Sequence, residues 1–166
     1  MRWGEVHEIP CSIARALAVV GERWTLLILR EIFFGARRFD ELRRRLGIAR
    51  NVLATRLDHL VEHAVLEKVA YQDRPARYEY RLTSKGRDLY PVLLALLQWG
   101  DRWQAGTSPP SLTLLHTNCG APIEPVTACG HCGDPLTPST TRARMSAERL
   151  SAPTAPGPTR PAHAGR

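Results

Sequence analysis

The sequence predicts a mostly α (α+β) fold, a winged helix-turn-helix with a long C-terminal dimerisation helix, on three observations. Two short amphipathic helical patterns meet at Gly47, two runs of period two then flank a turn at 73–76, and a long apolar helical pattern follows Thr83. A cysteine-containing segment and a tail rich in Ala, Pro, Ser and Thr come last. The expected units are a DNA-binding and dimerisation domain (1–106), a linker (107–111), a zinc-ribbon-like knuckle (112–137) and a disordered tail (138–166).

Two helices are predicted at the start of the domain. Ser12 is the expected N-cap of the first helix, and Gly21 separates it from the second. The second helix, about residues 24–34, is apolar on most faces and ends at Gly35. A helix of this kind is buried, so we expect it at the centre of the core. The apolar positions of the first helix are Ile13, Leu17 and Val20.

A helix-turn-helix is predicted next, between residues 39 and 64. Gly47 is the natural left-handed stop of its first helix, and Ile48 is expected to be buried behind the turn. The apolar positions are Phe39, Leu42 and Leu46 in the first helix, and Leu53, Leu57, Leu60, Val61 and Ala64 in the second.

The next segment predicts a β-hairpin with a basic tip. Apolar residues alternate with polar ones, and the turn contains Asp73, Arg74, Pro75 and Ala76. A hairpin attached directly to a helix-turn-helix is the wing of a winged helix. The alternating residues are Val69, Tyr71, Tyr78, Tyr80 and Leu82.

A long closing helix is predicted from Thr83, its cap, to about Gln104. Pro91 should kink or restart it. Its apolar residues cover more than one face, which a small domain cannot bury alone, so we expect a homodimer seam; a broader monomeric core is the alternative. These residues are Leu89, Val92, Leu93, Leu96, Leu97, Trp99 and Trp103.

Positive charge is concentrated on the helix-turn-helix. Residues 37–56 contain seven arginines against Asp40 and Glu41, a local charge of +5 in a chain whose formal net charge is +7. A concentrated basic patch indicates a polyanionic partner, although a solvated helix face has the same composition.

The predicted partner is double-stranded DNA, because the second helix of such a pair enters the major groove by its N-terminal end. Phosphate contacts would fix the register and base contacts the sequence. The candidates on this second helix are Arg50, Asn51, Thr55, Arg56 and His59; Arg38, Arg43 and Arg44 would anchor the preceding helix, and Arg74 and Arg77 the wing.

Several local phrases resemble the HxlR-type family of bacterial winged-helix transcription regulators. They are Cys11 followed by the helix motif Gly21-Glu22-Arg23-Trp24, the pattern from Phe39 to Leu60, and the closing pattern from Tyr80 to Trp99. The resemblance covers about residues 7–104. It implies a dimeric repressor or activator on an inverted repeat, with the first and last helices forming the dimer. Typical members end soon after the closing helix, whereas this chain continues for about sixty residues.

Cys11 is a redox-sensor candidate. It lies just before the first helix, and thiolates are favoured at helix N-termini. In some members of the resembled family a cysteine at this place senses oxidants, quinones or aldehydes. The alternative is a small buried hydrophobic residue beside the dimer seam.

Four residues in HTNCGAPIEPVTACGHCG predict a structural zinc site: His116, Cys119, Cys129 and Cys132. Each pair has the two-residue gap that lets both side chains reach one ion, and Cys₃His sets hold tetrahedral zinc. His131 could substitute for His116. A redox-active Cys129/Cys132 pair and a disordered segment with incidental cysteines are the alternatives.

The expected function is therefore a sequence-specific transcriptional regulator, with a thiol-switched regulator as an alternative within that class, and not an enzyme. No nucleophile with a base, paired carboxylates or phosphate-cradling glycine loop is evident in the sequence. The alternative is a protein-interaction adaptor that uses the winged domain and the knuckle. No secretory leader or bilayer-spanning run is recognised, so we expect a cytoplasmic protein with reduced cysteines.

Overall fold

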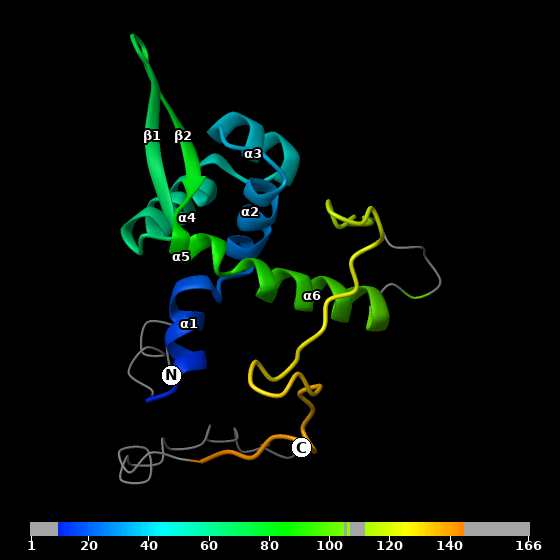
Figure 1. Cartoon of the computed structure of the whole chain (residues 1–166). Helices are drawn as coiled ribbons and strands as arrows, with labels where there is room; N and C mark the ends of the chain where they lie inside the picture. Colours follow the sequence, from blue (N-terminus) through cyan, green and yellow to red (C-terminus); the bar gives the residue numbers. More distant parts are fainter. Residues whose placement is uncertain (1–9, 105, 107–111, 145–166) are drawn as a thin grey trace, which may run out of the picture.

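The computed structural model describes residues 10–104, 106 and 112–144. The predicted linker 107–111, most of the predicted disordered tail, and residues 1–9, where a leader would begin, lie outside these residues. The elements, in the order drawn in Figure 1, are α1 (Ser12–Val20), α2 (Arg23–Phe33), α3 (Phe39–Leu46), α4 (Arg50–Glu62), β1 (Leu66–Asp73), β2 (Ala76–Leu82), α5 (Ser84–Arg87) and α6 (Tyr90–Trp103).

The core lies where α2, α3 and α4 meet the base of the hairpin. Ile28 and Leu29 of α2 are fully buried, which confirms α2 as the central helix. Gly47 ends α3 with φ 61°, a backbone conformation that favours glycine, and Ile48 behind it is buried. The predicted helix-turn-helix is thus confirmed. The other fully buried leucines of this region are Leu42, Leu53, Leu57, Leu60 and Leu66.

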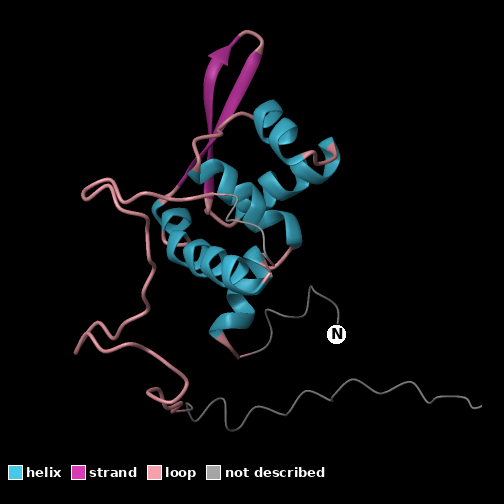
Figure 2. Cartoon of the chain, turned by 90° about the vertical axis from the view of Figure 1, so that its right-hand side faces the viewer, coloured by secondary structure: helices cyan, strands magenta, loops and turns pink. Residues whose placement is uncertain are grey.

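The wing is an antiparallel hairpin that projects beyond the helices (Figure 2). Its register pairs Leu66 with Leu82 at the base and Asp73 with Ala76 at the tip. The loop before α3 adds to the far edge of β2, because the Tyr80 N–H donates to the Arg37 carbonyl oxygen (2.8 Å) and Arg38 forms a single bridge with Glu79. The sequence pattern did not predict this isolated bridge.

The first helix begins differently from the prediction. Its N-cap is Cys11, whose side chain makes no capping hydrogen bond, and Ser12 is the first helical residue. The Ser12 hydroxyl instead accepts a hydrogen bond from the Arg15 guanidinium (2.9 Å). The predicted Ser12 cap was therefore wrong by one position.

The closing helix is divided in two. Thr83 caps α5 as predicted, since its hydroxyl accepts from the Gly86 N–H (3.1 Å). The chain then restarts as α6, with Pro91 in the first turn. A backbone N–H at this position would have no partner within the helix, so proline breaks no hydrogen bond there. In place of the single long helix that was predicted, the structure has the short helix α5 and the longer helix α6. The restart occurs at Pro91, as predicted.

Residues 112–144 contain no helix and run beside α6 and then away from the helical domain (Figure 1). Two tight turns, held by backbone hydrogen bonds, give this segment its local order. Among the described residues, no helix is both long and apolar enough to cross a bilayer.

Candidate nucleic-acid interface

A cleft of about 690 Å³ lies between the start of α3, the start of α4 and the wing. Five cationic side chains and two carboxylates line it, so its local charge is positive. Its aromatic residues come from both the helices and the hairpin. The cations are Arg38, Arg44, Arg50, Lys68 and Arg77, and the carboxylates are Asp40 and Glu41.

Three of these cations lie over aromatic rings. The Arg50 guanidinium carbon is 5.2 Å from the centroid of the Phe39 ring, and that of Arg38 is 4.6 Å from the centroid of the Tyr71 ring. Across the hairpin, Lys68 Nζ lies 4.7 Å from the centroid of Tyr78. Such contacts hold a cation in place without neutralising it.

The prediction did not include Lys68, Tyr71 or Tyr78 as site residues. No local motif marks them. Lys68 is paired with Tyr80 and Tyr78 with Ala70, so Lys68 and Tyr78 are diagonal neighbours on the hairpin. Cross-strand pairing in the predicted hairpin was the signal that could have found this contact.

The arginines of α3 divide into two kinds. Arg45 forms ion pairs with Glu41 (2.7 Å) and, across to α2, with the buried Glu31 (3.5 Å). Arg43 and Arg44 are exposed and form no ion pair within the described part of the chain. The cations available to a polyanion on this helix are therefore the two that the sequence analysis named.

The recognition helix α4 exposes only part of the predicted set. Arg50, Asn51 and Thr55 are exposed on its outer face, and Asp58 continues this face. The Thr55 hydroxyl donates to the Asn51 carbonyl oxygen (3.0 Å).

Arg56 and His59 lie on the flank of α4 instead. Arg56 Nε is 3.9 Å from a Glu22 carboxylate oxygen, and the His59 ring donates from Nε2 to the Val19 carbonyl oxygen (3.2 Å). Both side chains are half-buried. The structure thus places them against the α1–α2 junction, and their role as DNA contacts stays a prediction.

The two wing arginines occupy different places. Arg77 lines the cleft, whereas Arg74 is in the turn at the exposed tip of the hairpin. Both are exposed. The wing therefore adds positive charge at two points along its length.

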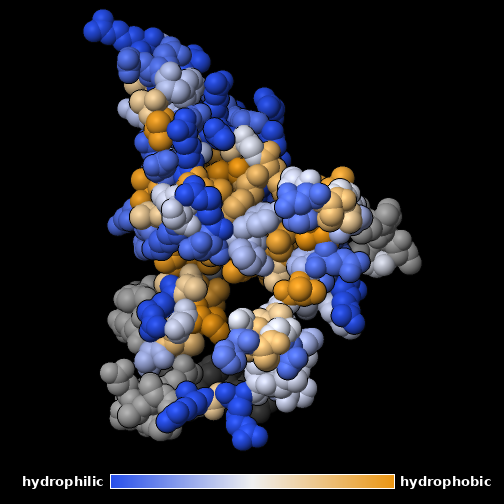
Figure 3. All heavy atoms as spheres, in the orientation of Figure 1, coloured by the Kyte–Doolittle hydropathy of each residue, from blue (hydrophilic) through white to orange (hydrophobic). Residues whose placement is uncertain are grey.

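A second surface, on α1 and α6, is apolar. Ile13 is 71% exposed and Trp103 is 62% exposed, and α6 buries none of its residues fully. Figure 3 shows the hydrophilic tip of the wing and hydrophobic side chains gathered over α1 and α6. The other large apolar residues exposed on these two helices are Leu17, Val92, Leu96 and Trp99.

Cys11, the redox-sensor candidate, lies at the edge of this apolar surface. It is half-buried at the N-cap of α1, and its carbonyl oxygen accepts from the Arg15 N–H (3.0 Å). Its thiol is two residues from the exposed Ile13.

The four zinc candidates form two separate pairs. His116 Nδ1 lies 3.3 Å from Cys119 Sγ. In the other pair, the backbone N–H groups of Cys132 and His131 and the Cys132 side chain hold the pKa of the Cys129 thiol below its usual value. One group of three possible ligand atoms lies close together in the described part of the chain, on α4 and just after it. Its residues are His59, Glu62 and His63.

Residues 19–108 match the family model described as HxlR-like helix-turn-helix. An uncharacterized HTH-type transcriptional regulator of Mycobacterium tuberculosis, Rv3095, is 50% identical over 126 residues, which are 76% of this chain and 80% of the relative. Because 126 residues exceed the 106 that precede the predicted linker, the similarity extends into the C-terminal segment.

Two solved structures show the same fold. That of PA1607, a proposed transcription factor, aligns with a TM-score of 0.77 at 37% identity and covers 84% of this chain and 98% of PA1607. The reduced form of the redox regulator HypR aligns with a TM-score of 0.52 at 29% identity, over 55% of this chain and 92% of HypR.

Proposed function

Because this chain belongs to the HxlR-like family of helix-turn-helix transcriptional regulators, we propose that it binds an inverted-repeat operator as a homodimer. In each half-site, α4 lies in the major groove and the wing lies against the neighbouring backbone. The observation that supports this most directly is the cationic cleft between α3, α4 and the wing.

The side chains of the cleft suggest how the contacts are divided. Asn51, exposed in the first turn of α4, can bond an adenine edge with both its donor and its acceptor, and Arg50 can do the same with guanine. Arg44 and Arg77 line the same cleft and would contact phosphates on either side. Base preference would then come from α4, and most of the affinity from the surrounding arginines.

The homodimer proposal is supported by the apolar surface of α1 and α6. Side chains such as Leu96 and Trp99 are half exposed in the single chain, and exposed apolar residues gathered on a helix are typical of a subunit interface. A two-fold axis through α6 would present two copies of α4, and operator half-sites read in this way lie about one helical turn, roughly 34–36 Å, apart.

Thiol switching is proposed through Cys11. This residue is the N-cap of α1 and precedes the exposed Ile13 by two residues, so a modification of its Sγ would place a polar or bulky group near the end of the helix assigned to the dimer. HypR, which shares the fold, is a redox regulator known in a reduced and an oxidized form. We expect oxidant treatment to change dimer packing and hence operator affinity.

Selection of bound sites from random duplex DNA, with and without reductant, tests the proposal. The reduced protein should enrich an inverted repeat with two equivalent half-sites. Enrichment of a single half-site would contradict the dimer, and no enrichment would contradict sequence-specific binding. An adaptor with an apolar docking surface would enrich nothing, and its partner binding would change little with salt.

A further inference from the structure

The C-terminal segment contains the same turn twice. Residues 116–123 and 129–136 share the pattern His/Cys-x-x-Cys-Gly-x-Pro-Ile/Leu, thirteen residues apart. His116 corresponds to Cys129, and Cys119 to Cys132. Metal-ligating side chains, glycine and proline recur together with one apolar residue, and a hydrophobic core does not explain the first three kinds.

The backbone hydrogen bonds also repeat, at equivalent positions of the two turns. In the first turn the Gly120 N–H donates to the His116 carbonyl oxygen (2.7 Å), and the His116 N–H donates to the Ala121 carbonyl oxygen (2.8 Å). In the second turn the Gly133 N–H donates to Cys129 (2.8 Å), and the Cys129 N–H donates to Asp134 (2.8 Å).

Each turn is closed by the same two features. The residues flanking the turn form an isolated bridge, Leu115 with Pro122 and Ala128 with Pro135. The glycine after the second ligand is left-handed, with φ 71° at Gly120 and 80° at Gly133, a conformation that other residues adopt rarely. Two segments with different flanking residues have therefore adopted one hairpin in which positions 1 and 4 face a common point.

We propose that each chain holds one structural zinc ion between these two hairpins, through His116, Cys119, Cys129 and Cys132. The three cysteines would bind as thiolates, their protons passing to solvent, and the histidine as a neutral imidazole. Four protein ligands close the tetrahedron and leave no position for a substrate or a water nucleophile. This proposal is independent of the DNA-binding proposal above.

The repeat decides between the two histidines. His116 is at position 1 of its hairpin, equivalent to Cys129, and its Nδ1 already lies 3.3 Å from Cys119 Sγ. His131 is at position 3 of the second hairpin, equivalent to Asn118, which cannot act as a usual zinc ligand. The structure therefore favours His116, where the spacing alone left both open.

The second hairpin has little else to stabilise it. The large apolar residues in it and just before it are exposed: Leu136 is 42% exposed, and Val126, three residues before the hairpin, is 86% exposed. Short segments of this kind depend on a metal for their folding energy. Within the described residues no three of the four ligand atoms lie within 4.8 Å of one another, so binding would require residues 124–128 to bring the hairpins together.

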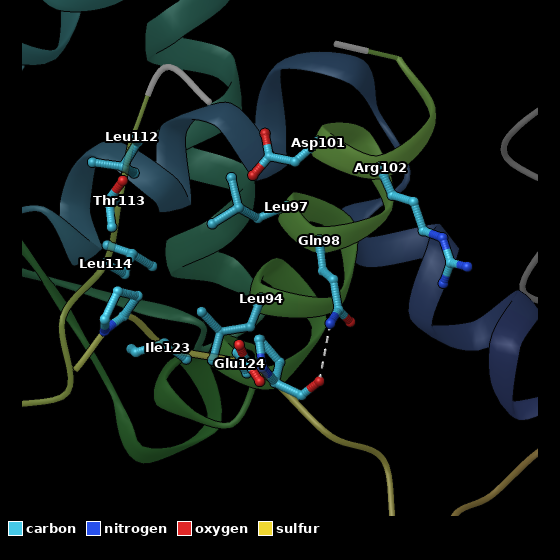
Figure 4. A pocket seen from close by; sticks show the side chains of 12 residues that line it. Leu94, Leu97, Gln98, Asp101, Arg102, Leu112, Thr113, Leu114, Ile123 and Glu124 are labelled. Atoms are coloured by element: carbon cyan, nitrogen blue, oxygen red, sulfur yellow. Dashed lines mark hydrogen bonds between the residues drawn. The ribbon is translucent and has the colours of Figure 1, made fainter. Parts of the chain in front are cut away.

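The first hairpin is anchored to the helical domain. Leu114 and Ile123 face Leu94 and Leu97 of α6 across a hollow of about 400 Å³ (Figure 4). Gln98 Nε2 donates to the Pro125 carbonyl oxygen (3.2 Å) immediately after the hairpin. A metal bound by both hairpins would thus attach the second one to α6 through the first.

His59, Glu62 and His63 form a competing set of close ligand atoms on α4. His59 Nε2 donates to the Val19 carbonyl oxygen and His63 Nδ1 donates to the His59 carbonyl oxygen, which leaves the second nitrogen of each ring available to a metal. A closed structural zinc site needs four ligands, whereas this set contains three ligands and no thiolate, so it matches such a site less well than Cys₃His.

Zinc content of the full chain, purified without a histidine tag under reducing conditions, tests the proposal. We expect about one zinc per chain, and the Co²⁺-substituted protein should show the intense visible absorption of tetrahedral thiolate coordination. Absence of zinc together with absence of this Co²⁺ spectrum would overturn the proposal.

Matched variants test the ligand set. Cys119→Ser, Cys129→Ser and His116→Ala should each lose most of the zinc, His116→Cys should retain it, and His131→Ala and His63→Ala should be unchanged. Loss of zinc from His63→Ala would show that the metal is bound on α4. Loss from His131→Ala but not from His116→Ala would show that His131, and not His116, is the ligand. Unchanged helical circular dichroism in every variant excludes a general folding defect.

Discussion

Arg38 and Tyr71 join the helix-turn-helix to the wing, with the guanidinium carbon of Arg38 4.6 Å from the centroid of the Tyr71 ring. Arg38 is also the N-cap of α3 and bridges Glu79 on the other strand. One residue therefore contacts both strands of the wing and starts the first helix of the pair.

Replacing Tyr71 by alanine should weaken DNA binding about fivefold, because Arg38 loses a contact of about 1 kcal/mol that orients it in the cleft. Tyr71→Phe keeps the ring and should bind almost as the wild type. Fluorescence anisotropy with a selected duplex at fixed salt measures both. Equal affinity of Tyr71→Ala and the wild type would show that the ring does not position Arg38 for DNA.

Asn51→Ala and Arg43→Ala should have different effects. Loss of the Asn51 amide should relax base preference at one position of each half-site, at a cost of about 1–3 kcal/mol for the preferred sequence. Loss of the exposed Arg43 guanidinium should weaken binding to all duplexes alike and reduce the salt slope by about one. Competition against single-base operator variants distinguishes the two, and an equal loss of preference would contradict this division.

Arg45→Ala should affect stability more than DNA binding. The change removes ion pairs with Glu41 and Glu31, and because Arg45 is 39% exposed we expect a loss of only about 0.5–1 kcal/mol. Urea unfolding measures this free energy. The matched control is Arg44→Ala, which should leave the unfolding midpoint nearly unchanged and weaken DNA binding instead.

Leu96→Asp should shift the protein from dimer to monomer. The residue is 46% exposed on α6, where a carboxylate would be desolvated in the proposed interface but tolerated by the single chain. Sedimentation velocity measures the change. Val126→Asp, at an 86% exposed site outside α6, is the control and should remain dimeric; an unchanged dimer in Leu96→Asp would place the interface elsewhere.

Cys11→Ser should bind the operator as the wild type does under reducing conditions, since serine is a good N-cap and close in size. After oxidant treatment the wild type should lose affinity and the variant should not. The comparison requires the same duplex and salt in both states. A variant that responds like the wild type would exclude Cys11 as the switch.

Much of the fold followed from local rules. Gly47 and Pro91 determine where α3 ends and where α6 starts through their backbone properties alone, and alternation in the hairpin predicted the wing. The pairing of Arg38 with Glu79 was missed, because a bridge of one residue has no period. Ser12 was assigned as the cap because its hydroxyl suits that role, yet the helix begins one residue earlier.

The candidate site was less predictable because it depends on contacts across the chain. Arg43, Arg44 and Arg45 are adjacent in sequence, and only Arg45 is engaged by Glu31, fourteen residues away. Arg56 and His59 fit the helical period of α4, but the positions of Glu22 and Val19 direct them to the flank. These partners come together only because α1, α2 and α4 pack against one another, so no local sequence pattern predicts them.

The ratio of operator affinity to random-duplex affinity, measured across a salt series for the reduced full chain, tests the central claim most directly. The account predicts specific binding about 10³-fold or more above non-specific binding, with both affinities falling steeply as salt rises. Equal affinity for the two duplexes, or binding that does not change with salt, would contradict it.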